Sequence, residues 1–153
     1  MPHTKEELIK LIDLDEPDYP SIVAKLSLED IPLLIELSKD PNLAIATKAI
    51  SCLGMMNAEK AVVGIQAAVV SANPVLRVAA AHALRNSAAL PSAVKLIDKL
   101  LDDSDIGVRK FALKAVNHAN IKSLKAKVEK MNVKENTELM KNLSKEVFLK
   151  INK

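Results

Sequence analysis

One pattern of small and branched apolar residues occurs three times along this chain, at intervals of 31 and 32 residues. Each copy places such residues three, six and seven positions after a common start. From that start, the copies read Ala46, Ala49, Cys52 and Leu53, then Arg77, Ala80, Ala83 and Leu84, then Arg109, Ala112, Ala115 and Val116. A fixed period of this length is typical of proteins built from stacked repeats.

Each copy is predicted to contain two helices. The first carries apolar residues at helical spacing, as in Ile31, Leu34 and Leu37. The second follows a polar break such as Asn73-Pro74, where Asn suits the helix cap and Pro suits the first turn. Since neither helix can bury its apolar stripe alone, neighbouring hairpins must stack. The sequence therefore predicts an all-α fold, a right-handed α–α solenoid of about four to five helical hairpins.

The second helices resemble the HEAT-like repeat family, in its short, phycobilisome-lyase-like form of about 31 residues per unit. The family's pattern is an acidic or proline turn, then Val-Arg, then Ala-x-x-Ala-Leu. The stretches Leu76–Leu84 and Val108–Val116 match it well, whereas Ala46 stands where the first copy should have arginine. The resemblance covers residues 27–119. It predicts the fold more specifically than the function, because the family contains mostly protein-binding scaffolds and a few enzymes.

The resemblance also assigns a structural role to Arg77 and Arg109. In this family the arginine pairs with an acidic residue of a turn. The acidic turn residues available here are Asp40, Asp103 and Asp105. The alternative is that the two guanidinium groups reach a ligand.

The repeats are expected to form a single domain over residues 1–153. Thr4 and Glu7 have the spacing of a capping box and open the first helix. The last helix, by contrast, carries one apolar face among many lysines, as a terminal unit requires to remain soluble. The expected units are an N-terminal cap over 1–26, repeats over 27–56, 57–87 and 88–119, and a C-terminal cap over 120–153.

Composition bears on whether the chain forms disulfides, carries a signal peptide or spans a membrane. The single cysteine, Cys52, excludes an intrachain disulfide and is expected to be a buried small hydrophobe, with chromophore attachment or nucleophilic catalysis as alternatives. The first ten residues lack the apolar run of a signal peptide. The longest uncharged run, 61–76, is too short and too polar to span a bilayer. We therefore expect a cytoplasmic protein without a membrane segment.

In HEAT-like stacks the second helices line the concave side. By helical phase, positions one, five, eight and nine of each copy should face this groove. The groove should change from neutral to basic towards the C-terminal end, which favours an acidic segment of a protein partner. The residues expected to bind this partner are Thr47, Ser51, His82, Arg85, Lys110, Lys114 and His118.

Catalysis, cofactors and metals are not expected. His82 and His118 lie on the same predicted face, but a metal site needs a third ligand. The chain contains no Gly-rich phosphate loop, Cys-x-x-Cys or His-Glu-x-x-His motif. Two enzyme groups share the fold: alkylpurine DNA glycosylases need an aromatic cluster that this chain lacks, and bilin lyases share only the repeat. Phe111 is expected to pack between helices. The sequence thus favours a non-catalytic protein-binding scaffold.

Nucleic-acid binding is the alternative function, because residues 120–153 carry nine lysines and four glutamates. Residues 1–40, in contrast, carry four lysines and ten acidic residues. In a stacked fold these segments become an acidic and a basic end. We expect a monomer, or weak head-to-tail self-association through the two ends.

Overall fold

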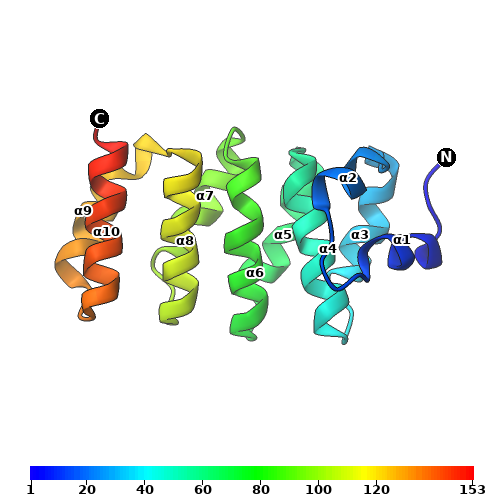
Figure 1. Ribbon diagram of the computed structural model, residues 1–153, viewed down its shortest axis with the longest axis horizontal. Helices are drawn as coiled ribbons and strands as arrows, with labels where there is room; N and C mark the ends of the chain where they lie inside the picture. Colours follow the sequence, from blue (N-terminus) through cyan, green and yellow to red (C-terminus); the bar gives the residue numbers. More distant parts are fainter.

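The computed structural model describes residues 1–153, and all of its regular structure is helical. The helices stack as hairpins along one axis, with the two termini at opposite ends of the stack (Figure 1). The predicted all-α solenoid is confirmed. None of the helices is both long and apolar enough to cross a membrane.

Two layers of helices run along the stack (Figure 1). The first layer contains the first helix of each hairpin: α1 (Lys5–Ile12), α3 (Ile31–Leu37), α5 (Glu59–Val69), α7 (Pro91–Leu100) and α9 (Lys125–Lys134). The second layer contains α2 (Tyr19–Ala24), α4 (Leu43–Met56), α6 (Pro74–Leu84), α8 (Ile106–Ala119) and α10 (Glu138–Ile151). Short 3-10 helices lie at the junctions between hairpins: η1 (Leu28–Asp30), η2 (Arg85–Ser87) and η3 (Lys122–Leu124).

Polar side chains fix where the helices begin. The hydroxyl of Thr4 accepts from the amide of Glu7, and the Glu7 carboxylate accepts from the amide of Thr4, so the predicted capping box is present. Asn73 caps α6 by accepting from the amide of Val75 at 2.9 Å. These bonds satisfy amides that have no partner within the helix. Two of the second helices end on an asparagine in the left-handed conformation, Asn57 and Asn120.

The repeated small residues bring the second helices close together. Ala80, Ala83 and Leu84, like their counterparts in the other copies, are buried as predicted. Gly54, at a position expected to face the groove, is instead buried against α6. A Cβ atom at Gly54 would lie 2.3 Å from the carbonyl oxygen of Ala83. Glycine is therefore required at this close approach of α4 to α6.

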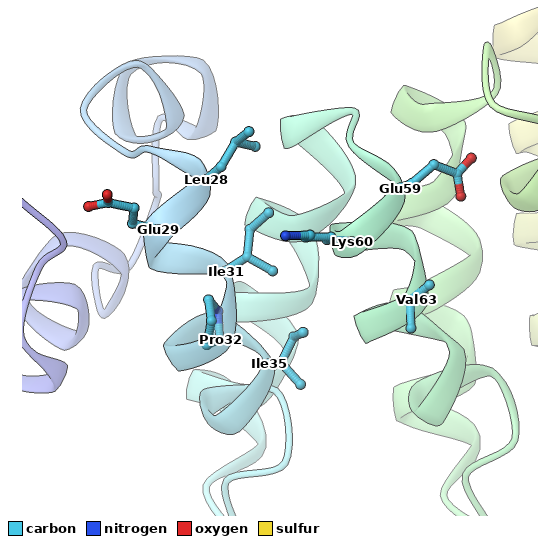
Figure 2. Close-up of a pocket in the computed structure, with 8 residues that line it drawn as sticks. All are labelled: Leu28, Glu29, Ile31, Pro32, Ile35, Glu59, Lys60 and Val63. Carbon is cyan, nitrogen blue, oxygen red and sulfur yellow. The ribbon is translucent and has the colours of Figure 1, made fainter.

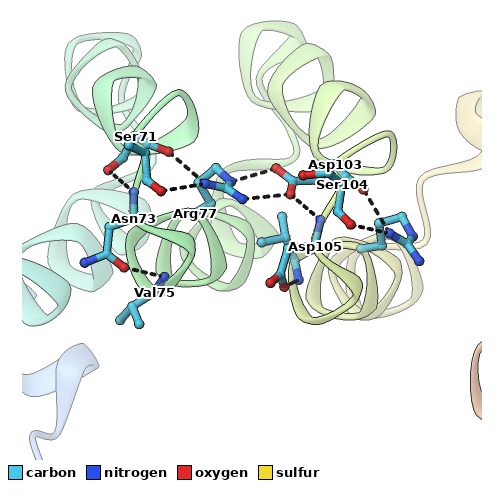
Figure 3. A network of polar contacts seen from close by, with 10 residues as sticks. Ser71, Asn73, Val75, Arg77, Asp103, Ser104 and Asp105 are labelled. Atoms are coloured by element: carbon cyan, nitrogen blue, oxygen red, sulfur yellow. Dashed lines mark hydrogen bonds and ion pairs between the residues drawn. The ribbon is translucent and has the colours of Figure 1, made fainter.

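Two arginines link successive hairpins, and Figure 3 shows the first of these links, from Arg77 to Asp103. Nε and Nη2 of Arg77 donate to the Asp103 carboxylate at 2.8 and 3.1 Å, while Nη1 donates to the carbonyl of Ser71 at 2.9 Å. Arg109 makes the equivalent fork to Glu135, at 2.7 and 2.9 Å. The structural role predicted for both arginines is confirmed.

Two of the carboxylates considered as arginine partners act differently. Asp40 accepts from the amide of Asn42 within its own turn, in the copy that has Ala46 in place of arginine. Asp105 caps α8 by accepting from the amide of Val108. Each arginine pairs instead with the carboxylate 26 residues further along the chain, so Arg77 binds Asp103 and Arg109 binds Glu135 of the next hairpin.

Candidate functional site

A small basic cavity opens between α6 and α8. α6 contributes His82, η2 contributes Arg85, and α8 contributes the remaining residues. Residues three and seven positions apart share one face of a helix, so α8 presents several side chains together to α6. The cavity has a volume of about 200 Å³ and is lined by His82, Arg85, Phe111, Lys114, Ala115 and His118. It brings together four of the seven residues predicted to bind a partner.

Phe111 organises the side chains of the basic cavity. The His82 imidazole meets it edge to face, with ring centroids 5.8 Å apart and an interplanar angle of 81°. The Lys114 ammonium lies 5.3 Å from the centroid of the same ring. Nη1 of Arg85 lies 3.5 Å from Nδ1 of His82. Phe111 does pack against the core between helices, as expected, but its part in the cavity was not predicted.

The electrostatics of the basic cavity are one-sided. No acidic residue lines it. Burial lowers the pKa of His82 below its ordinary value of 6.5, and the positive charges of Arg85, His118 and Lys114 lower it further. The neutral imidazole is therefore favoured, and the cavity remains electropositive through its arginine and lysine.

The other three predicted binding residues do not line the cavity. Lys110 lies on α8, one turn before Lys114, and is half-buried. Thr47 and Ser51 lie on α4. Their hydroxyls donate to carbonyls of their own helix, Thr47 to Leu43 at 2.8 Å and Ser51 to Thr47 at 3.1 Å. A role for these residues in partner binding remains a prediction.

An apolar groove lies in the other layer, between α3 and α5 (Figure 2). Its volume is about 790 Å³. The Leu28 and Val63 residues on its border are 63% and 62% exposed. The groove is lined by Leu28, Glu29, Ile31, Pro32, Ile35, Glu59, Lys60 and Val63. Sequence reasoning missed it, although Leu28 and Val63 stand outside the positions that the core needs.

Cys52 is buried, as predicted. Burial raises the pKa of its thiol to about 12, because an apolar setting disfavours the thiolate. Cys52 therefore packs in the core as a small apolar residue. No three His, Cys, Asp or Glu side chains gather as a set of metal ligands.

Comparison with known proteins places this geometry in a known fold. A scan against protein-family models and a search of curated proteins found no match. Among solved structures, the chain aligns with a chain from the complex of CpcE and CpcF of phycocyanin lyase from Nostoc sp. PCC7120. This chain shares the fold of a phycocyanin lyase chain. The alignment has a TM-score of 0.65 at 16% sequence identity and covers 99% of this chain and 66% of the solved chain.

This comparison corrects the prediction that the chain is not an enzyme. That prediction rested on absent motifs, such as a Gly-rich loop or a His-Glu-x-x-His sequence. The solved chain belongs to a phycocyanin lyase, so this fold occurs in an enzyme complex. The helical repeat is therefore no argument against catalysis, because function belongs to sites that a fold supports and not to the fold.

Proposed function

We propose that this protein is a helical-repeat module that holds an acidic segment of a partner protein against its second helices. The observation that carries the proposal is the basic cavity of α6 and α8, whose lining contains no acidic residue. An acidic segment would supply the missing negative charge. Complementary charges of this kind guide a partner to the surface and fix its register.

A solved relative in fold supports a protein partner. The phycocyanin lyase structure is itself a complex of two proteins, CpcE and CpcF. This likeness also favours a second candidate function, namely that this protein forms part of a lyase. In that case the partner would be a second helical-repeat chain or the protein on which the lyase acts.

Nucleic-acid binding has weaker support. The phycocyanin lyase complex offers no support for it, and single-strand binding needs several aromatic platforms for the bases. The basic cavity offers a single aromatic ring, Phe111, whose surroundings are taken up by His82 and Lys114.

The test is capture of partners from native lysate, after nuclease treatment and at moderate salt. The unaltered chain is compared with a double variant that carries Lys110→Glu and Lys114→Glu. We expect the double variant to lose a discrete protein that the unaltered chain retains. The control is Lys95→Glu with Lys99→Glu, which makes the same charge change at exposed positions of α7. Circular dichroism verifies that each variant is folded.

Three outcomes would count against the proposal. Full retention of the partner by Lys110→Glu with Lys114→Glu would show that the second helices do not hold it. If the Val63→Glu variant loses the partner and the lysine double variant does not, the contact lies in the apolar groove between α3 and α5. Recovery of nuclease-sensitive material only would favour the nucleic-acid alternative.

A further inference from the structure

Arg85 differs from the other two arginines of the chain. The guanidinium groups of Arg77 and Arg109 donate to Asp103 and Glu135, and both also donate to backbone carbonyls. Arg85 has no carboxylate partner, and its Nε is buried without any hydrogen-bond acceptor. A buried donor without an acceptor is costly. Arg85 thus lacks the carboxylate that the other two arginines bind, and its side-chain neighbour at the wall of the basic cavity is Nδ1 of His82, 3.5 Å from its Nη1.

The surroundings of Arg85 and His82 offer no internal anion. α8 presents Lys114 and His118 to this site, both of them basic. On the elements packed against the other sides of α6, the carboxylates are engaged elsewhere. Glu59 of α5 accepts from Ser92, Asp98 of α7 pairs with Lys127, and the only charged residue of α4, Lys48, pairs with Asp13. The other charged residues of α5 and α7 are lysines: Lys60, Lys95 and Lys99.

The size of the basic cavity and the geometry of its donors limit the kind of ligand that it could bind. At about 200 Å³ the cavity is smaller than a site for a drug-sized ligand, which occupies about 300–1,000 Å³. The fork of Arg85 matches the two oxygens of a carboxylate. Lys114 and the imidazoles add further donors around the same space.

We propose that the basic cavity is a carboxylate-binding site, with Arg85 as the fork, Lys114 and His118 as flanking donors, and His82 as a further donor that binds more strongly when it is protonated. The carboxylate belongs either to an aspartate or glutamate of the partner protein or to a free small carboxylic acid. The first source rests on the proposed function, whereas the second does not.

Binding should depend on pH through His82. The lowered pKa of His82 leaves the imidazole neutral near pH 7. A bound carboxylate would favour the imidazolium and raise that pKa. By linkage, the carboxylate should therefore bind more tightly as the pH falls through the titration of His82.

The experiment is NMR observation of the imidazole protons of His82 and His118 during titration. One arm uses acetate, with chloride exchanged for acetate at constant ionic strength. The other uses a capped glutamate-containing peptide, with its glutamine counterpart as a control. We expect saturable shifts of both imidazoles and a rise of the His82 pKa. Tighter binding of the peptide than of acetate would identify a protein segment as the source, and equal binding would identify a free acid.

Variants decide whether the site is specific. Arg85→Gln should weaken binding by about tenfold or more, since a charge-assisted bond is lost. Arg85→Lys should restore part of it, because the charge remains while the fork is lost. Lys95→Gln, an equal charge change on α7, should leave binding unaltered. The amide spectrum of each variant verifies its fold.

The proposal is overturned if the shifts rise linearly without saturation, or if Lys95→Gln weakens binding as much as Arg85→Gln. These results are independent of the partner-capture experiment. If acetate and peptide fail to bind but capture still depends on Lys110 and Lys114, the proposed function stands and the carboxylate site does not. If the carboxylate binds but partner capture does not depend on Lys110 and Lys114, the carboxylate site stands and the proposed function fails.

Discussion

His82 lies where two repeats meet, half-buried between α6 and α8. Its backbone position comes from the repeat, since it is five residues after Arg77 in α6. Its chemical character comes from the neighbouring repeat, which supplies Phe111, Lys114 and His118. A histidine in these surroundings titrates below the ordinary range because both burial and nearby positive charge oppose the imidazolium.

The lowered pKa of His82 predicts a loss of stability towards acid. Between the folded pKa and the unfolded value of about 6.5, the unfolded chain binds more protons at this residue. The free energy of unfolding should therefore fall as the pH drops below about 6.5, and the loss should be complete below the folded pKa. Urea unfolding at pH values from 8 to 5, in buffers free of carboxylates, measures this loss of unfolding free energy. The range covers about three pH units, enough to span the titration of an imidazole.

His82→Gln should flatten this part of the pH profile. His118→Gln is the matched control, because His118 is exposed and its variant should retain most of the slope. An unaltered slope in His82→Gln would mean that another group causes the acid loss.

The arginine forks connect hairpins rather than stabilising one helix. Arg109 reaches from α8 to Glu135, at the end of α9, and also donates to the carbonyl of Asp103 in the turn before its own helix. Glu135 is only 8% exposed, so its charge depends on this partner. Removal of one member of a shielded ion pair leaves the other without compensation.

A double-mutant cycle with Arg109→Gln and Glu135→Gln should measure this link. Each single variant is expected to lower the free energy of unfolding by about 1–3 kcal/mol, as for loss of a hydrogen bond to a charged group. The double variant should lose less than the sum of the two, because the residues interact directly. Additive losses, measured by urea denaturation, would show that the pair makes no mutual contribution.

Charge is unevenly distributed along the whole stack. The N-terminal 40 residues carry ten acidic side chains, and the C-terminal segment 120–153 carries nine lysines. These segments lie at opposite ends of the solenoid (Figure 1). An acidic end and a basic end can attract each other between molecules, but salt screens exposed charges that are more than a Debye length apart.

We expect weak head-to-tail association at low ionic strength and a monomer at physiological salt. The Debye length falls from about 30 Å at 0.01 M to about 8 Å at 0.15 M, which removes most of this attraction. Sedimentation velocity at several protein concentrations measures the association. Lys130→Glu, at an exposed position of α9, should reduce the association. Lys95→Glu on α7 should have a smaller effect. Association that persists at high salt would exclude a charge-driven contact.

Local and periodic signals were readable directly from the chain. The small residues at positions three, six and seven predicted which faces are buried, and Asn73 and Thr4 predicted where helices begin. These features depend on helical spacing and on backbone amides a few residues away, so the local sequence contains all the information they need. The repeat period then predicted the all-α solenoid, because such hairpins bury their apolar stripes only by stacking.

Contacts between hairpins required the folded molecule. Three features depend on how one hairpin lies on the next. They are the pairing of Arg109 with Glu135 and not Asp105, the place of Phe111 in the basic cavity, and the apolar groove along α3 and α5. Helical phase gives the direction of a side chain relative to its own helix. The distance between side chains on different helices, and hence any site they share, depends on the packing of the two layers.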